Sequence, residues 1–364
     1  MRVLVCPDKF KGSLTASEVC LAIHKGLIRF DSDIETIMLP LADGGEGTLD
    51  VLESVLETER VELIANNPLM RPISTYYLQS KDLAFIEMAN ASGLQLLKNH
   101  ERNPLSTTTF GTGEMIRHAL DRGVNHIYLL IGGSATNDGG IGMAKALGYN
   151  FEVSGENFKA DGAGLPFIEG LLKDDIHSRI EEVKFTVLSD VRTKLLGKDG
   201  ASYTYGRQKG ADDKAIDQLD QGLTNLSNVL NNGFENVPGS GAAGGLGYGA
   251  MSFLKAEIKS GIETILDIVG FHKNVESVDL IITGEGKLDA QTAEGKVISG
   301  VLHQANTYNI PIGIICGLAD LRMSGIDPKS IYQVTDLALN HSDAMTNARK
   351  YVEDLAFNLI SDIR

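Results

Sequence analysis

The sequence predicts an α/β fold with two domains. Short apolar runs alternate with helical patterns along the whole chain, which is typical of largely parallel sheets covered by helices. A length of 364 residues is more than one ordinary hydrophobic core needs, and it suits two domains. Hydrophobic residues make up 43% and charged residues 22%, so the chain can fill its interiors and still dissolve.

The N-terminal segment predicts two strand–helix pairs. Residues 3–6 form an apolar run typical of a buried strand. Residues 15–30 then predict a helix, because Val19, Ile23 and Leu27 recur at intervals of four and share one face. The second strand and helix are predicted at 36–40 and 47–56.

The pattern changes near residue 62, where we expect a second domain to begin. Asn66-Asn67-Pro68 is a turn signal, and the runs at 73–78 and 83–88 predict antiparallel strands. The same periodicities predict further strands at 127–131, 183–188, 279–283, 312–316 and 331–334, and helices at 140–147, 213–231 and 343–360.

The order of these elements predicts a discontinuous Rossmann-like parallel-sheet domain with a second α/β domain inserted into it. The first domain is expected to comprise residues 1–62 and 265–364, and the inserted domain residues 63–264. The stretch 197–249 is glycine-rich and polar, so loops are expected there around the helix at 213–231.

Composition limits the partners and the compartment. A net charge of −15 argues against nucleic acid or an anionic membrane as the main partner. The three cysteines form no metal-ligand or disulfide pattern, which fits a reducing compartment; Cys6 and Cys316 lie in apolar runs and are expected to be buried thiols. No apolar run reaches the roughly 18 residues of a membrane span, and the N-terminus does not resemble a signal peptide. A cytoplasmic protein is expected.

Two polar clusters follow the first two predicted strands. The first contains Asp8, Lys11 and Ser13, and the second contains Asp43 and Glu46 among three glycines. Ligands bind beyond the carboxyl ends of strands in open parallel sheets, so these groups suit an anionic, hydroxylated substrate. The simpler interpretation is helix capping, by Ser13 or Thr15 at the first helix and by Asp43 at the second.

Two further loops are rich in hydroxyl groups and glycine. Residues 106–114 and 132–140 each precede a helix, and such loops bind phosphate through N–H and O–H donors. The second is the strongest phosphate-loop candidate, and its predicted ligand residues are Gly133, Ser134, Thr136 and Asn137. The segment 239–244 matches G-x-G-x-x-G, but no strand directly precedes it, so a dinucleotide site is not expected.

Charged residues at two later strand ends add further candidates. Asp190 follows the strand at 183–188, where a carboxylate could orient or deprotonate an attacking hydroxyl; Arg207 and Lys209 could neutralise phosphate. The segment 283–289 carries Gly284, Glu285, Gly286, Lys287 and Asp289, a suitable neighbourhood for Mg²⁺ and phosphate.

Several familiar signatures are absent from the sequence. There is no GxxxxGK[ST] loop, no HRD or DFG, no HExxH and no GxSxG. The residues alone therefore indicate an α/β enzyme that handles a small phosphorylated or phosphorylatable metabolite.

Taken together and in order, these clusters resemble the bacterial glycerate kinase family (type I). The matching segments are PDKFKGSLTASEV at 7–19, PLADGGEGT at 40–48, FIEMANASGL at 85–94, IGGSATNDGGIGMAKALG at 131–148, SDV at 189–191, DGAS at 199–202, QKGA at 208–211, GSGAAGGLG at 239–247, FLKAEIKSGIE at 253–263 and ITGEGKLDAQT at 282–292. The chain departs from the family pattern at Arg192-Thr193-Lys194, Arg207, Lys287 and Ile298.

The resemblance implies a two-domain enzyme with its site in the cleft between the domains, converting ATP and D-glycerate to ADP and 2-phosphoglycerate. It implies ATP and Mg²⁺ as cofactors, with Glu285 and Asp289 as metal ligands. The implied substrate contacts are Asp8, Lys11, Ser13, Asp43 and Glu46; the loops at 133–138 and 283–287 would hold the nucleotide phosphates, and Asp190 would be the base.

Several alternatives stay open at this point. The product could be 3-phosphoglycerate, and the acceptor could be a related small sugar acid. A metabolite-binding regulator on a decayed enzyme scaffold is the alternative from another class, although the intact acidic and glycine-rich loops argue against it. The assembly is expected to be a monomer or a homodimer.

Overall fold

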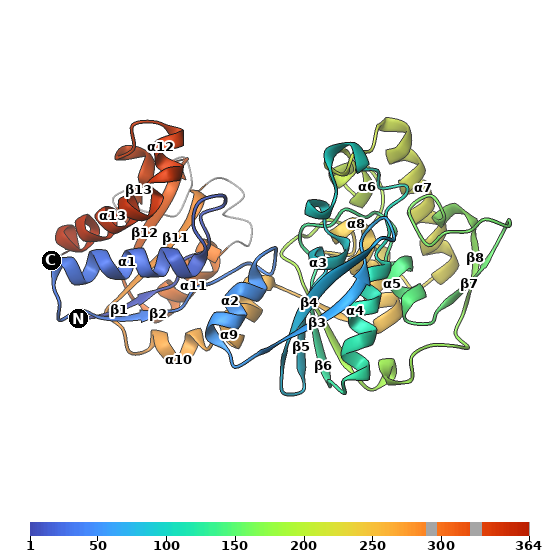
Figure 1. The fold of residues 1–364 in the computed structure, drawn as a ribbon, viewed down its shortest axis with the longest axis horizontal. Helices are drawn as coiled ribbons and strands as arrows, with labels where there is room; N and C mark the ends of the chain where they lie inside the picture. The colour runs from blue at the N-terminus through green and yellow to red at the C-terminus, as the bar shows by residue number, and fades with distance from the viewer. Residues whose placement is uncertain (289–296, 321–329, 364) are drawn as a thin grey trace. The chain divides into compact units, whose positions relative to one another are not determined.

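The computed structural model describes residues 1–288, 297–320 and 330–363. The chain forms two compact units, each built on its own sheet (Figure 1). The first unit comprises Met1–Asp43, Asp50–Leu56 and Ser260–Arg364, and the second comprises Gly44–Leu49 and Glu57–Lys259. The predicted domains, 1–62 with 265–364 and 63–264, differ from these units in their boundaries and in the segment Gly44–Leu49.

The sheet of the first unit is parallel throughout, as the apolar runs predicted. Because all its strands run the same way, the loops that follow them gather at one edge. In spatial order the strands are β13 (Ile331–Gln333), β12 (Ile312–Ala319), β11 (Leu280–Leu288), β1 (Arg2–Val5) and β2 (Glu35–Met38).

Helices cover both faces of this sheet (Figure 1). Successive strand residues point to opposite faces, so Ile315 of β12 packs into the core with α1 (Ala16–Phe30) and α13 (Ala348–Ile363). Its neighbours Ile314 and Cys316 pack into a second core with α11 (Val297–Tyr308) on the other side.

The predicted helix at 343–360 is wrong in one respect: two helices occupy this region, α12 (His341–Thr346) and α13. Asn347 ends α12, where its side chain donates to Asp343 Oδ1 at 2.7 Å and its backbone N–H donates to the Asp343 carbonyl. The remaining α-helices near this sheet are α2 (Thr48–Val55), α9 (Gly261–Ile268) and α10 (Phe271–Val275).

The second unit contains a mixed sheet of six strands. The antiparallel pairing predicted for 73–78 and 83–88 is confirmed, and the strands after it run parallel. In spatial order they are β10 (Glu257–Lys259), β9 (Lys184–Leu188), β6 (His126–Leu130), β5 (Leu83–Glu87), β4 (Pro72–Ser80) and β3 (Glu59–Asn66).

The core of this unit lies between the sheet and its helices. It joins Ile86, Leu129 and Val187 of the strands with Met115 and Met143 of two helices. The α-helices are α3 (Ala89–Ser92), α4 (Phe110–Asp121), α5 (Ile141–Ala146), α6 (Ala201–Tyr205), α7 (Asp213–Leu230) and α8 (Ala242–Leu254); β7 (Asn150–Val153) and β8 (Ile168–Leu172) form a separate antiparallel pair. The 3₁₀ turns are η1 (Leu94–Leu96), η2 (Asn99–Glu101), η3 (Leu165–Phe167), η4 (Ser178–Glu181), η5 (Arg207–Lys209), η6 (Phe234–Asn236) and, in the first unit, η9 (Val334–Asp336).

The stretch 197–249 was predicted to form loops around one helix at 213–231. The structure has additional helices there, α6 and the start of α8. The helix α8 begins within the glycine-rich run, and Leu246 and Tyr248 are fully buried. Burial of these side chains explains the helix, while Ala243, Gly244 and Gly245 have positive φ and kink its first turn.

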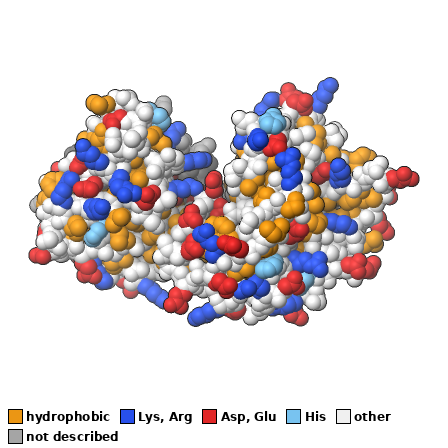
Figure 2. Space-filling view, viewed as in Figure 1, with side chains coloured by type: hydrophobic (Ala, Val, Ile, Leu, Met, Phe, Trp, Pro, Cys, Tyr) orange, Lys and Arg blue, Asp and Glu red, His pale blue; other side chains and the backbone are white. Residues whose placement is uncertain are grey.

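The surface and the cysteines fit the expectations from composition. On the face drawn in Figure 2, acidic and basic side chains are interspersed. Cys6, Cys20 and Cys316 are free and buried, which confirms the buried thiols expected at Cys6 and Cys316. Among the described helices, none combines the length and the apolar character needed to cross a membrane.

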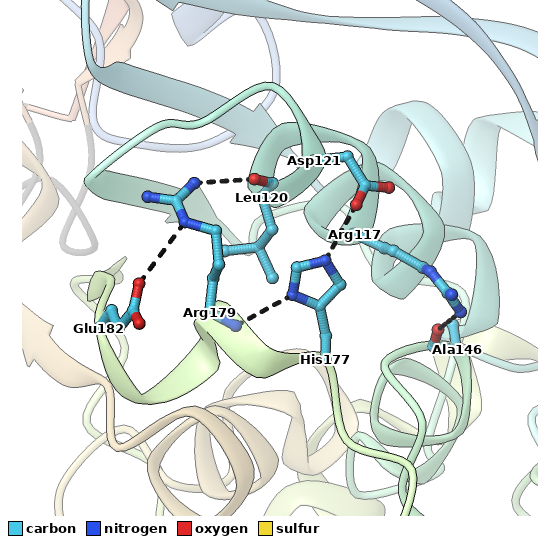
Figure 3. Close-up of polar contacts among 7 residues, drawn as sticks. All are labelled: Arg117, Leu120, Asp121, Ala146, His177, Arg179 and Glu182. Atoms are coloured by element: carbon cyan, nitrogen blue, oxygen red, sulfur yellow. Dashed lines mark hydrogen bonds and ion pairs between the residues drawn. The ribbon is translucent and has the colours of Figure 1, made fainter.

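A polar cluster fixes the end of α4 in the second unit (Figure 3). The guanidinium of Arg179 donates to the Leu120 carbonyl at 2.8 Å and to Asn125 Oδ1 at 3.1 Å. The ring of His177 lies between Asp121, 3.0 Å from Nε2, and the backbone N–H of Arg179, which donates to Nδ1 at 3.3 Å. These bonds hold the turn that leads from α4 into β6.

We expect Arg179→Met to lower the free energy of unfolding by about 1–2 kcal/mol, because it removes a charge-assisted bond to a helix-terminal carbonyl. Circular dichroism is a suitable probe, since the chain has no Trp. Arg117→Met is the matched control, because Arg117 makes one long bond of 3.4 Å to the Ala146 carbonyl. Equal losses in the two variants would show that the Arg179 bonds contribute no specific stability.

Candidate active site

Two loops of the first unit meet the C-terminal half of β11 at the carboxyl edge of its sheet. Asp8 follows β1, and its backbone N–H donates to the carbonyl of Gly284, within β11, at 2.8 Å. The strand predicted at 279–283 continues to Leu288, so the predicted residues 284–287 lie in β11 and not in a loop after it. The Pro7 carbonyl accepts from the backbone N–H of Leu41, which follows β2, at 2.9 Å. These bonds hold the segments carrying the predicted residues Asp8, Asp43 and Glu285 side by side.

The carboxyl group of Asp8 has an unusual electrostatic environment. Burial raises its pKa, the negative charges of Asp43 and Glu285 raise it further, and the result is about 7. The backbone N–H of Lys9 donates to Asp8 Oδ1 at 2.7 Å and lowers the pKa in part. A carboxyl group that titrates near neutral pH is suited to exchanging a proton with a substrate.

The donor chemistry of this edge fits Mg²⁺. Glu285 is 4% exposed, and it acts electrostatically on Asp8 together with Asp43. Mg²⁺ usually binds one or two carboxylates and completes its shell with water and phosphate oxygens. Within the described ranges no group of three or more His, Cys, Asp or Glu side chains is arranged as a metal site, and the predicted ligand Asp289 lies outside those ranges.

The other predicted residues of this edge differ in their surroundings. Lys11 and Lys287 are exposed, while the Ser13 hydroxyl donates to the Phe10 carbonyl at 3.1 Å. The cap of α1 is Thr15, in a capping box with Glu18, so the alternative of a cap at Ser13 is wrong.

Gly286 allows a close approach of two of these segments. A Cβ there would lie 3.0 Å from the backbone nitrogen of Lys11 and 3.2 Å from Cα of Phe10. A side chain at position 286 would therefore push the loop after β1 away from β11. A Cβ on Gly284, the other glycine predicted here, would lie 1.9 Å from the Ile315 carbonyl oxygen of β12.

A second set of loops gathers in the second unit, at the carboxyl ends of β5, β6 and β9. Glu87 ends β5 and is buried, and it accepts from the backbone N–H of Gly47 at 3.1 Å. A Cβ on Gly132, after β6, would lie 2.8 Å from Cα of Gly45. Asp190 follows β9 and is half-buried. Within the second unit, Gly45 is thus in direct contact with the predicted loop 132–140.

Most of the predicted ligand residues in the loop after β6 have buried side chains. Ser134, Thr136 and Asn137 are all buried, whereas Gly133 is exposed with φ of +75°. Asn137 Nδ2 donates to Ser202 Oγ at 2.8 Å. In the part of the chain that the structure describes, Thr136 Oγ1 and Asn137 Oδ1 are buried without a hydrogen-bond partner.

Lys209 and Arg207, the two basic residues predicted to neutralise phosphate, lie in different environments. Lys209 is buried, and its Nζ donates to Ser134 Oγ and to the Thr136 carbonyl, both at 2.7 Å. Arg207 is exposed and forms an ion pair with Asp213. The sequence places both in one polar segment, and only the structure shows that Lys209 reaches the loop after β6.

The predicted residues therefore form two groups. Asp8, Asp43, Glu285 and their neighbours share one sheet edge, whereas Glu46, Gly133, Ser134, Thr136, Asn137 and Asp190 share the other. Sequence reasoning assigned no role to Glu87, although an acid at the end of an apolar strand is a signal that could have identified it.

Comparisons with known proteins identify relatives of this chain. The chain is 40% identical to a glycerate kinase of Bacillus cereus, covering 99% of this chain and 97% of the relative. It is 39% identical to the glycerate 2-kinase of Escherichia coli K12, covering 90% of this chain and 89% of the relative.

A solved structure and a family model extend the likeness to the whole chain. A crystal structure described as that of glycerate kinase 2 from Salmonella typhimurium LT2 matches with a TM-score of 0.87 at 38% identity, covering 100% of this chain and 98% of that one. The family model described as "Glycerate kinase family" matches residues 3–364. The chain belongs to the glycerate kinase family.

Proposed function

We propose that the chain transfers the γ-phosphoryl group of ATP to a hydroxyl of D-glycerate, giving 2-phosphoglycerate and ADP. The observation that carries the proposal is Asp8, a carboxyl group with a pKa of about 7 at the carboxyl edge of a parallel sheet. Membership of the family and the names of the relatives support glycerate as the acceptor. The name of the Escherichia coli relative supports position 2.

The chemistry needs positioning, charge neutralisation and one proton acceptor. Asp8 takes the proton of the glycerate hydroxyl as that oxygen bonds to the γ-phosphorus and the bond to the ADP oxygen breaks. Asp190, the base predicted from the sequence, is the alternative acceptor, and it lies at the other sheet edge.

The other predicted residues act on charge and orientation. Glu285, with Asp289 from the sequence, would hold Mg²⁺, which supplies positive charge against the phosphates. Lys11, Ser13, Asp43 and Glu46 would orient glycerate. The loop 133–138 and the segment 283–287 of β11, with their glycines and Lys287, would hold the nucleotide phosphates. A reaction that consumes ATP fits the cytoplasmic location predicted from the sequence.

An ATP-consumption assay with purified protein and D-glycerate tests the proposal, followed by NMR of the product. The expected product carries phosphorus on the oxygen of carbon 2, and phosphorus on the oxygen of carbon 3 would contradict the assigned position. Tartronate and other small sugar acids belong in the same assay, because faster turnover of one of them would replace glycerate as the acceptor. Absence of ATP consumption with every acid would favour the binding-protein alternative.

We expect Lys11→Met to raise the KM for glycerate by about 10- to 100-fold, because a charge-assisted contact with the carboxylate contributes about 1.5–3 kcal/mol. Lys25→Met is the matched control, since Lys25 is an exposed lysine of α1 in the same unit. An unchanged KM for glycerate in Lys11→Met would remove Lys11 from the acceptor site.

A further inference from the structure

Lys209 carries a positive charge into the interior of the second unit. Its side chain is 2% exposed, and its ammonium group makes two hydrogen bonds, to neutral oxygens of Ser134 and Thr136. Over residues 1–288, 297–320 and 330–363 it forms no ion pair. An ammonium group has three donors, so one N–H remains for another partner.

The burial of this charge is unfavourable in the protein alone. Charged groups in protein interiors are normally paired, because burial removes their hydration. Burial lowers the pKa of Lys209 to about 7, and the negative charge of Asp138 offsets this in part. The nearby pair Arg207 and Asp213 is exposed and mutually compensated. An anion beside Nζ would supply the missing counter-charge.

The surroundings of Nζ point to the kind of anion. Both of its partners belong to the loop after β6, at the carboxyl edge of the sheet, where ligands of parallel sheets bind. In the same loop Thr136 Oγ1 is buried and has no partner among the described residues, so a hydroxyl donor is also available. Ammonium, hydroxyl and the backbone N–H groups of Gly132 and Gly133 are the donors that phosphate requires.

We propose that Lys209 binds the phosphate groups of the nucleotide in the loop after β6, and that nucleotide binding draws a proton onto its amine. The inference rests on the proposed function, since it assigns a residue of the same site. The bonds to Ser134 and Thr136 alone would give Lys209 a purely structural role, as a brace for the loop. The two roles differ in one measurable respect, because a brace does not couple nucleotide binding to a proton.

Calorimetric titration of the full chain with the magnesium complex of adenylyl imidodiphosphate separates these roles. Buffers of different ionisation enthalpy report the protons taken up on binding. Well above pH 7 the free amine is largely neutral, so we expect uptake that approaches one proton at about pH 8.5 and little at about pH 6. The ligand's own protonation is removed by subtracting the signal of Lys209→Met.

We expect Lys209→Met to bind adenylyl imidodiphosphate about 10- to 100-fold more weakly and to lose the proton uptake. Adenosine, which lacks phosphate, should bind both proteins alike. Lys214→Met is the matched control, because Lys214 is an exposed lysine of α7 a few residues away, and it should retain affinity and uptake.

Equal proton uptake in the wild type and Lys209→Met would overturn the proposal, as would unchanged affinity. If Lys209→Met fails to fold, the wild type and Lys214→Met are compared instead. Absence of proton uptake on nucleotide binding in both proteins at about pH 8.5 would overturn the proposal. The proposed function fails separately, if the wild type binds the nucleotide with proton uptake but forms no phosphoglycerate.

Discussion

Replacement of Asp8 by Asn is expected to lower kcat by about 100-fold or more, with the affinities for glycerate and nucleotide changed by less than about threefold. The amide has nearly the same shape as the carboxyl group and can still accept the backbone N–H of Lys9. It cannot take the proton of the acceptor hydroxyl. The loss therefore falls on the chemical step, which initial rates at saturating substrates measure.

The pH dependence gives an independent check on Asp8. A base must be deprotonated, so kcat/KM of the wild type should rise through about pH 7, where the Asp8 carboxyl group titrates, and this limb should be absent in Asp8→Asn. The raised pKa also means that the folded state binds this proton more tightly than the unfolded chain. The contribution of Asp8 to stability is thus present at low pH and lost as pH rises through about 7, so Asp8→Asn should melt no lower than the wild type above that pH.

Asp190→Asn is the comparison that decides the identity of the base. Asp190 is half-buried at the end of β9, a position that suits a base as well as a turn cap. Near-normal kcat in Asp8→Asn together with a 100-fold loss in Asp190→Asn, on the order expected for general base catalysis, would transfer the role to Asp190.

The fold could be predicted where burial produces continuous apolar runs. The strands β1, β11 and β12 are largely buried, and the prediction places the start of each within one residue. The predicted ends are wrong for β12, which continues three residues further, and for β11, which continues five residues further, through the polar and glycine residues 284–287. The edge strand β3 was not predicted, because its exposed residues, among them Glu59 and Arg60, interrupt the apolar pattern. The start of α8 was not predicted either, because its glycines have a low helix propensity. Burial of its apolar side chains stabilises the helix nevertheless.

The site could be predicted only as separate loops. The polar residues after each strand are visible in the sequence, but the strand order is not. That β1 lies between β11 and β2 brings Asp8 close to both Glu285 and Asp43, and this proximity raises the pKa of Asp8. The burial of Lys209 depends on packing between segments about 75 residues apart, so its polar sequence neighbours gave no sign of it.

Asp138 holds together the loop that carries the predicted phosphate ligands. It is fully buried and accepts hydrogen bonds from the backbone N–H and the hydroxyl of Thr109, at 2.7 and 2.8 Å, and from the backbone N–H groups of Gly140 and Gly142, at 3.1 and 3.3 Å. The Thr109 hydroxyl in turn accepts from the backbone N–H of Met143 at 2.9 Å. One carboxylate thus joins the start of α4 to the start of α5.

Asp138→Ala is expected to lower the free energy of unfolding of the second unit by about 3–5 kcal/mol, because it leaves buried N–H donors without an acceptor. Two units need not unfold together, so hydrogen exchange of peptides from each unit is the suitable measurement, with the loss of protection confined to the second unit.

Asp213→Ala is the matched control: Asp213 is exposed at the start of α7, and its removal should cost less than about 0.5 kcal/mol. Asp138→Asn should fall between the two, since the amide oxygen can still accept from Thr109 and Gly142 while its NH₂ group faces the N–H group of Gly140. Protection in Asp138→Ala equal to that of the control would show that other contacts hold the loop.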